Sequence, residues 1–310
     1  MALSPGTDPP PSLVDFDAQW DYDRPGETEA RFRALLPAAR ASGSRDYLVQ
    51  LLTQIARTEG LQRRFDDAER TLAEAESLLT SETGVARVRL KLEQGRVLNS
   101  SKRREQSKPL FLEAWNLARG AGAHAFAVDA AHMLGIVETG EASITWNERA
   151  MSLAESSPDP KARRWLGSLY NNLGWTYHGR GRYATAFDLF QKALTERQKE
   201  GKKPEIRIAR WCVARCLRSL GRVEEALAAQ RALYDEFQAE GGMDGYVVEE
   251  IAECLLLSHR EEEAKPHFAH AYRELSRDPW LQESEAPRLE RLARLGGVEP
   301  GTPAGPPSAT

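Results

Sequence analysis

The sequence contains little cysteine. Its three cysteines, Cys212, Cys216 and Cys254, are odd in number and lack the spacing of a disulfide framework. We expect reduced thiols that pack as small apolar side chains. Cys212 and Cys216 share a helix face at four-residue spacing, but no further ligands can be placed beside them, so a metal site is not predicted.

Long apolar runs are also absent. No stretch approaches the ~20 consecutive apolar residues that a membrane-spanning helix needs. Residues 1–17 lack a basic region followed by an apolar core, so they do not have the pattern of a secretory signal. The sequence therefore predicts no contact with a membrane, and a cytoplasmic location is the default expectation.

Motifs that carry catalysis are missing as well. The sequence has no Gly-rich phosphate loop and no nucleophile elbow. His267 and His270 lie three residues apart near Glu263, which is not the HExxH spacing of a zinc protease. We expect these histidines to be a surface pair on a helix. The sequence predicts a protein that is not an enzyme and that needs no cofactor.

The composition is that of a helical globular protein. Of the 310 residues, 41% are hydrophobic and 28% are charged, which is ordinary for a folded domain. Ala, Leu, Arg and Glu dominate, and these residues favour helix. The net charge is only -4, so the charge balance of the whole chain indicates no class of partner.

The stretch from Lys161 to Glu200 is the most informative part of the chain. It contains two sets of residues at helical spacing, separated by the pair Gly181-Arg182. The sets are Tyr170, Leu173, Gly174 and Tyr177, and then Tyr183, Ala186, Phe190 and Ala193. Two amphipathic helices joined by a tight turn form a helical hairpin.

This pattern resembles a tetratricopeptide repeat, and a small residue recurs in the same slot along the chain. The slot is filled by Ala68, Ser107, Ala186, Ala226 and Ala264, at steps of 39, 79, 40 and 38 residues. The mean near 39 is longer than the ~34 of the basic repeat. It is similar to the longer-helix variety of kinesin light chains. The resemblance implies an all-α, right-handed α-solenoid of about seven hairpins.

Three regions are predicted. Residues 1–26 are rich in Pro and Asp and form a disordered or loosely docked arm, in which Phe16, Trp20 and Tyr22 are expected to pack on the first helices. Residues 27–295 form the solenoid and end in a capping helix. Residues 296–310 form a disordered tail. In the first helix the apolar set stops at Pro37, where the helix can kink.

The resemblance also implies a concave groove lined mainly by the first helix of each hairpin. The residues expected to face it are Asn171, Asn172, Trp175, His178, Trp211, Arg215, Arg218, Arg57 and Arg96. In this family an Asn just before the Leu slot often holds the backbone of a bound peptide, and Asn172 has that place. For Trp175 and Trp211, packing between helices is the alternative to a role in the groove.

Charge is segregated along the chain. Residues 161–222 contain 15 Lys or Arg and 4 Asp or Glu, whereas residues 223–263 contain 2 and 12. This asymmetry favours an acidic or phosphorylated ligand on the basic part. The alternative is that neighbouring repeats pair, with Arg215 and Arg218 bound to Glu249 and Glu253. Nucleic acid is disfavoured, because no nucleic-acid motif accompanies the basic residues.

The sequence thus predicts a non-enzymatic protein–protein interaction scaffold that binds a peptide segment, acidic in character, in its groove. The alternative is a sensor that recognises a small signalling ligand, or that self-associates as a homo-oligomer, to control a partner protein. The sequence itself indicates neither the partner nor the oligomeric state.

Overall fold

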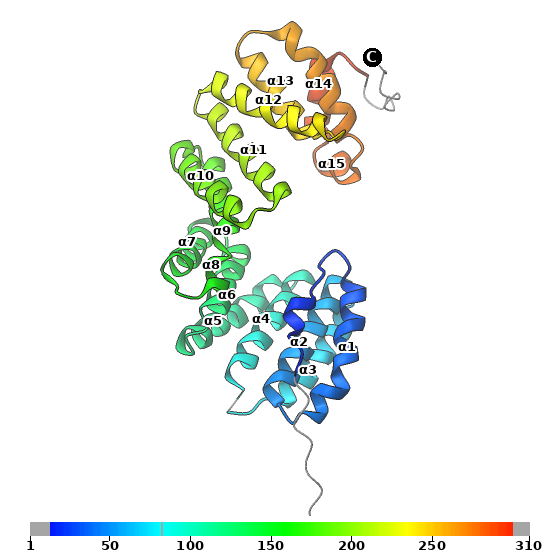
Figure 1. Ribbon diagram of the computed structural model, residues 1–310, viewed down its shortest axis with the longest axis vertical. Coiled ribbons are helices and arrows are strands. Elements are labelled where there is room, and N and C mark those ends of the chain that lie inside the picture. The colour runs from blue at the N-terminus through cyan, green and yellow to red at the C-terminus, as the bar shows by residue number, and fades with distance from the viewer. Residues whose placement is uncertain (1–12, 82, 300–310) are drawn as a thin grey trace, which may run out of the picture. The chain divides into compact units, whose positions relative to one another are not determined.

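The computed structural model describes residues 13–81 and 83–299, and these residues form helices and the turns between them (Figure 1). The elements are η1 (Phe16–Gln19), α1 (Pro25–Ala41), α2 (Arg45–Leu61), α3 (Phe65–Ser77), α4 (Gly84–Ser100), α5 (Arg104–Gly120), α6 (His124–Val137), α7 (Gly140–Ser156), α8 (Pro160–Arg163), α9 (Leu166–Gly179), α10 (Tyr183–Glu200), α11 (Lys203–Ser219), α12 (Val223–Ala239), α13 (Gly245–Leu257), α14 (Glu261–Leu275), α15 (Pro279–Ser284) and α16 (Ala286–Gly296).

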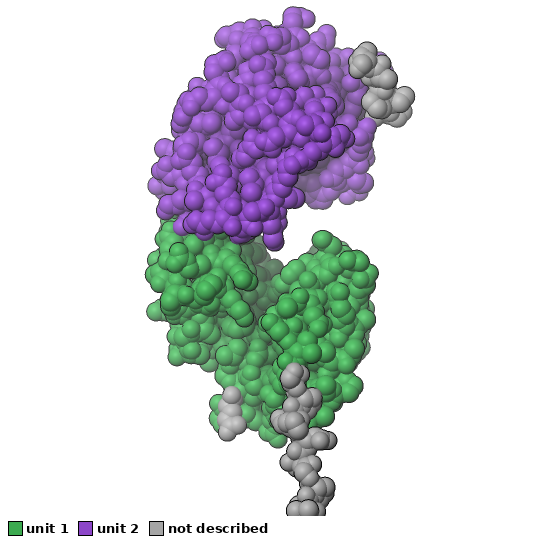
Figure 2. Space-filling model, viewed as in Figure 1, with its two compact units in different colours: residues 1–169 green, residues 170–310 purple. Residues whose placement is uncertain are grey.

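The chain forms two compact units, which Figure 2 shows in different colours. Unit 1 is Met1–Leu169 and unit 2 is Tyr170–Thr310. Unit 1 contains the hairpins α2/α3, α4/α5 and α6/α7, and unit 2 contains α11/α12 and α13/α14. Helix α9 begins in unit 1, and its part from Tyr170 onward pairs with α10 in unit 2. The predicted fold class, an all-α repeat of helical hairpins, is confirmed, with α1 as a single helix before the first hairpin.

In the hairpins α4/α5 and α9/α10, a glycine of the first helix faces a large side chain of the second. In α4, a Cβ added to Gly95 would lie 2.5 Å from Cε1 of Phe111, and in α9 one added to Gly174 would lie 2.6 Å from Cε1 of Phe190. Real Cβ atoms do not approach so closely, so only glycine lets these helices meet at this distance. Both pairs are sixteen residues apart, and the same spacing relates Ala56 to Leu72, Ala214 to Gln230 and Ala252 to Phe268.

The turn inside a hairpin places one residue in the left-handed region. Gly181, of the Gly-Arg pair that predicted a tight turn, has φ 72°, and Gly221, which is also followed by an arginine, has φ 77°. At the corresponding turns of other hairpins the residue is not glycine: Arg63, Lys102 and His259 have φ values of 62°, 66° and 56°. The turn geometry is therefore kept even where the glycine signal is missing from the sequence.

The N-terminal end of unit 1 departs from the prediction at Pro37. Helix α1 continues through Pro37 to Ala41, and Ala39, beyond the proline, is buried. The expectation that the apolar set stops at Pro37 is therefore wrong. A proline inside a helix removes one backbone hydrogen bond, yet α1 runs on for four residues beyond Pro37. Of the predicted arm, residues 1–12 lie outside the described residues, and Phe16 joins the core of α1 and α2.

Unit 2 closes with two helices where one capping helix was predicted. Leu289, Leu292 and Ala293 of α16 are buried in the same core as α13 and α14. The predicted tail lies outside the described residues from residue 300 onward. Within residues 13–81 and 83–299, every helix is too short or too polar to cross a bilayer.

Candidate functional site

The first helices of the hairpins form one surface in each unit, which we call the first-helix face. In unit 1 it is built by α2, α4 and α6, and in unit 2 by α9, α11 and α13. All nine residues predicted to line a groove lie on these helices. The structure assigns Arg57 and Arg96 to unit 1 and the other seven to unit 2.

On α9, two of the predicted residues, Asn171 and His178, contact the neighbouring helix α11. The Asn171 Oδ1 atom accepts a hydrogen bond from the Cys212 thiol at 3.4 Å, and His178 Nε2 lies 2.8 Å from the hydroxyl of Ser219. The His178 pKa is lowered by burial first and by nearby Arg215 and Arg218 second. Burial and the two arginines therefore both disfavour the protonated ring.

Asn172 and the tryptophans complete the unit 2 face. The Asn172 side chain is exposed beside this row. The Trp175 and Trp211 rings are 5.8 Å apart, and Trp211 lies 6.1 Å from the Tyr246 ring. The Trp211 indole N–H also donates to the Tyr246 carbonyl at 3.3 Å. An aromatic column thus runs from α9 through α11 to α13, and the two indoles pack between helices while remaining partly accessible.

An apolar pocket of about 480 Å³ opens beside this column. It is lined by Pro204, Arg207, Ile208, Trp211, Phe237, Asp244, Tyr246 and Val247. Ile208 is 59% exposed, which is unusual for a large aliphatic side chain next to an indole. The Arg207 guanidinium is occupied within the unit, because it lies 4.4 Å from the Phe237 ring centre and pairs with Glu240 at 2.8 Å. The pocket therefore offers mainly apolar contacts.

The two arginines of α11 are paired inside unit 2. Arg215 Nε and Arg218 Nε each lie 2.8 Å from a different oxygen of Glu250, whose exposed fraction is 4%. Burial works against the charge of Arg218, but its hydrogen bonds with Glu250 raise its pKa. Self-pairing is thus observed, although with Glu250 instead of the expected Glu249 and Glu253. Those two residues pair with Arg288 and Arg291 of α16.

In unit 1 the predicted arginines belong to one ion network. Arg57 Nη1 lies 3.1 Å and Arg96 Nη1 2.6 Å from the same oxygen of Glu93, and Arg96 also pairs with Asp129 of α6. Glu93 is only 3% exposed. Here two carboxylates match two guanidinium groups, so the network carries no excess charge.

Sequence reasoning missed Arg89, which extends this row. Arg89, Glu93 and Arg96 lie at i, i+4 and i+7 of α4, the same spacing as Trp211, Arg215 and Arg218. That spacing was a usable signal. A cavity of about 380 Å³ follows the row. Its lining includes Asp17, Trp20 and Tyr22 from the N-terminus together with Arg57, Arg89, Leu92, Glu93, Arg96, Gln54, Phe126, Asp129, Lys161 and Trp165.

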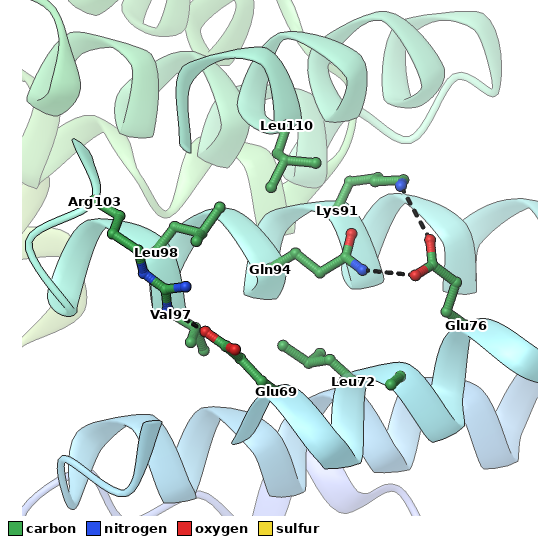
Figure 3. A pocket seen from close by; sticks show the side chains of 10 residues that line it. Glu69, Leu72, Glu76, Lys91, Gln94, Val97, Leu98, Arg103 and Leu110 are labelled. Carbon is green, nitrogen blue, oxygen red and sulfur yellow. Dashed lines mark hydrogen bonds and ion pairs between the residues drawn. The ribbon is translucent and has the colours of Figure 1, made fainter. Parts of the chain in front are cut away.

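A second hollow of unit 1, of about 440 Å³, lies between α3, α4 and α5 (Figure 3). Leu72, Val97, Leu98 and Leu110 supply its apolar lining. Its polar side chains are engaged with one another: Lys91 and Gln94 bind Glu76, and Arg103 pairs with Glu69. This hollow offers few polar groups to a ligand.

The cysteines pack in unit 2 as predicted. All three are buried, and burial raises the pKa of Cys212 to about 12, of Cys216 to about 11 and of Cys254 to about 12. Such thiols are poor nucleophiles at neutral pH. In the described part of the chain, His, Cys, Asp and Glu side chains do not gather in threes in a way that could hold a metal ion.

Comparisons with known proteins agree with this architecture. The family model described as "Tetratricopeptide repeat" matches residues 137–199, which includes α7, α9 and most of α10. No curated protein matches the chain significantly. The resemblance to kinesin light chain repeats stays a prediction.

Several solved structures share the fold. BtubC (BKLC) from P. vanneervenii is 15% identical with a TM-score of 0.56, covering 74% of this chain and 94% of that one. A Signal Transduction ATPase with Numerous Domains protein with a tetratricopeptide repeat sensor, from Pyrococcus horikoshii, is 14% identical with a TM-score of 0.67, covering 87% of this chain but only 44% of its own length. The APC/C hetero-tetramer Cut9-Hcn1 contains a chain that is 14% identical, with a TM-score of 0.50, covering 89% and 54%.

These structures support the fold and leave the ligand open. The family match identifies residues 137–199 as a tetratricopeptide repeat, and the hairpin contacts and the shared fold show that the described chain has the fold of a tetratricopeptide repeat solenoid.

Proposed function

We propose that the protein is a non-enzymatic interaction scaffold that binds a peptide segment of a partner on the first-helix face of unit 2. The observation that carries this proposal is the aromatic column of Trp175, Trp211 and Tyr246 beside an apolar pocket with an exposed Ile208. Exposed aromatic and aliphatic side chains that border a pocket are typical anchors for an apolar side chain of a ligand.

The polar groups of this face suit a peptide backbone. The exposed amide of Asn172 can both donate and accept a hydrogen bond, as an extended peptide requires. Asn172 lies next to Asn171, which contacts α11 through Cys212. The amide would thus hold the peptide backbone while the indoles contact its side chains.

The charge of the face supports an acidic segment. Arg215 and Arg218 share the single carboxylate of Glu250, so the trio keeps one positive charge. A peptide carboxylate placed beside it would replace the missing second partner. Charge-assisted hydrogen bonds of this kind are stronger than neutral ones.

A selection of random twelve-residue peptides against the full chain tests the proposal. We expect enriched peptides with an apolar residue close to Asp or Glu, and we expect binding of those peptides to fall at least tenfold in Trp211→Ala. Arg218→Ala should weaken the binding of acidic peptides by a factor of about three to ten, the range expected for loss of a partly exposed ion pair. Trp280→Ala is the matched control, because Trp280 is also an exposed tryptophan but lies on α15. Equal loss in Trp280→Ala and Trp211→Ala would contradict the proposal.

A sensor for a small ligand is the second candidate, favoured by the size of the apolar pocket. Its 480 Å³ falls within the usual range of small-molecule sites. The described Pyrococcus horikoshii protein also carries a tetratricopeptide repeat sensor. Anilinonaphthalene sulfonate, a small apolar dye, serves as the probe. Saturable dye binding that Ile208→Glu abolishes, in a chain that selects no peptide, would favour the sensor.

A further inference from the structure

Residues 13–24, which we call the N-terminal segment, have the chemistry of a peptide ligand. The segment reads LVDFDAQWDYDR, with four aspartates and three aromatic residues among twelve positions. It contains only the four-residue helix η1 and precedes the first helix of the repeat architecture. The contacts it makes with unit 1 show how an acidic and aromatic peptide is held there.

Phe16 is the apolar anchor of the segment. Its ring is 5% exposed and lies 6.1 Å from the Phe32 ring of α1 and 5.2 Å from the Tyr47 ring of α2, both edge to face. The Tyr47 hydroxyl donates to the Val14 carbonyl at 2.9 Å, so the backbone beside the anchor is held as well. A buried aromatic side chain with a backbone hydrogen bond next to it is a common form of peptide recognition.

Asp17 supplies the acidic contact. Both of its oxygens meet the guanidinium group of Arg89 on α4, and Arg89 Nη1 is 3.0 Å from Oδ2. Arg89 also donates to the Gln50 side chain at 3.1 Å, and its guanidinium lies 5.3 Å from the Phe16 ring centre. A forked arginine contact of this type is specific for a carboxylate. Arg89 thus recognises the acid and the ring that precedes it.

The end of the segment reaches the arginine row of the first-helix face. The Trp20 indole donates to Gln54 Oε1 at 3.1 Å and stacks on Tyr22 with ring centres 4.5 Å apart. The Arg57 guanidinium lies 5.9 Å and 5.6 Å from these two rings. The 380 Å³ cavity begins at this point, with Trp20 and Tyr22 in its lining, and continues to Lys161 and Trp165.

The segment contacts α2 and α4 of this face through a small number of side chains, and its other contacts are with α1. Its contacts with α2 and α4 include the Phe16 ring against Tyr47, the Asp17–Arg89 ion pair, hydrogen bonds with Gln54 and Tyr47, and the ring contacts of Arg57 and Arg89. Phe16 and Trp20 also pack on Phe32 of α1, and Asp21 and Arg24 bind Thr28 and Glu27 there. Tyr22 remains 58% exposed. The segment can compete with a separate peptide mainly because it is tethered, and tethering gives a short linked ligand a high effective concentration. A longer peptide that also fills the cavity beyond Trp20 would make contacts that the segment lacks.

We propose that the N-terminal segment is an internal ligand that occupies the first-helix face of unit 1, and that an acidic and aromatic peptide of a partner protein binds there by displacing it. The recognition elements are the pocket that holds Phe16, the guanidinium group of Arg89, and the side chains of Gln54 and Arg57. This site is in unit 1, so the inference is independent of the peptide site proposed for unit 2.

Fluorescence anisotropy with a synthetic, fluorescein-labelled peptide of residues 13–24 tests the inference on the full chain. The variant Phe16→Ala/Asp17→Ala removes the two main contacts of the internal segment and leaves the receiving surface intact. We expect this variant to bind the labelled peptide at least tenfold more tightly than the wild type. Arg89→Ala added to the variant should abolish the gain, and Trp211→Ala added instead should leave it unchanged.

The controls separate this site from unit 2 and from unfolding. A labelled peptide carrying Asp17→Lys should bind no variant. Asp17→Asn alone keeps the Phe16 packing, and we expect it to raise affinity three- to tenfold, which keeps the test valid if the double variant does not fold by circular dichroism. Equal affinity of the wild type and the opened variants would overturn the inference. Binding that depends on Trp211 and not on Arg89 would also overturn it, by assigning the peptide to unit 2.

Discussion

The first-helix faces of the two units have similar residues at the same spacing, yet the charges of their arginines are balanced differently. In unit 1, Arg57 and Arg96 are matched by Glu93 and Asp129, and Arg89 is matched by Asp17 of the N-terminal segment. In unit 2, Arg215 and Arg218 share one carboxylate, and an aromatic column lies partly accessible beside them. Counting basic residues along the chain therefore does not reveal which of them are available to a ligand.

This difference suggests a division of labour. The unit 1 face is charge-balanced and covered at one end by its own chain, whereas the unit 2 face keeps one unmatched positive charge and an apolar pocket. The same hairpin scaffold can thus present a closed surface and an open one. Which of the two is open depends on a few side chains and on one short segment.

The largest effect is expected from removing the shared carboxylates. Both Glu93 and Glu250 are buried, so an alanine at either position leaves guanidinium groups without their partner, at a cost of about 3 kcal/mol or more in the free energy of unfolding. Glu250→Ala should cost more, because Arg96 keeps Asp129 when Glu93 is lost, whereas Arg215 and Arg218 have only Glu250 within salt-bridge distance among the described residues.

Urea unfolding of the two variants measures this comparison. Glu290→Ala, on an exposed position of α16, is a control that should change stability by less than about 0.5 kcal/mol. A larger loss for Glu93→Ala than for Glu250→Ala would show that the charge balance of the two faces is not as described here.

A smaller loss, about the same in both units, is expected at the tight helix contacts. A methyl group at Gly95 or Gly174 would meet Phe111 or Phe190, and overpacking of this kind typically costs about 1–3 kcal/mol. Thermal unfolding of Gly95→Ala and Gly174→Ala should show two similar decreases. Gly120→Ala in α5 is the matched control, because a Cβ there meets nothing within 4 Å, and we expect no loss. A loss of stability in only one of these two variants would mean that the tight helix contacts of the two units are not equivalent.

The smallest expected effect is a gain in stability, from a substitution in unit 2. Gln230 of α12 occupies the position that Phe111 has in the hairpin α4/α5 and Phe190 has in α9/α10. It is fully buried, and its Oε1 and Nε2 atoms have no hydrogen-bond partner among the described residues. Since an unpaired buried amide costs about 1–3 kcal/mol, Gln230→Leu should raise the free energy of unfolding by about 1 kcal/mol. Phe111→Leu in unit 1 should instead lower it. Destabilisation by Gln230→Leu would indicate that the amide has a partner.

Much of the fold was predictable from local pattern. Gly174 and Phe190 identify a hairpin because the tight approach of two helices demands a small residue opposite a large one, and this requirement is visible within one repeat. The prediction that the apolar set ends at Pro37 was wrong, because the local sequence pattern does not show that Ala39 is buried. Arg63, Lys102 and His259 show that a left-handed turn residue need not be glycine, so a missing Gly-Arg pair does not exclude a turn.

The candidate site was predictable only in part. The nine proposed residues do lie on first helices, because helical spacing determines which face a side chain occupies. Important partners of the arginines come from other hairpins: Glu250 is 32 residues beyond Arg218, and Glu93 is 36 residues beyond Arg57. Asp17 lies 72 residues before Arg89, in a segment whose composition indicated an arm. Pairing over such distances depends on how hairpins pack, which the periodicity of one helix does not contain.

We propose that unit 2 presents the open peptide-binding face. Hydrogen–deuterium exchange of the full chain, with and without a saturating selected peptide, tests it most directly. We expect slower exchange in residues 203–219 of α11 and 245–257 of α13, with the backbone of α2 and α4 unchanged. Slower exchange confined to α2 and α4, with α11 and α13 unchanged, would contradict it.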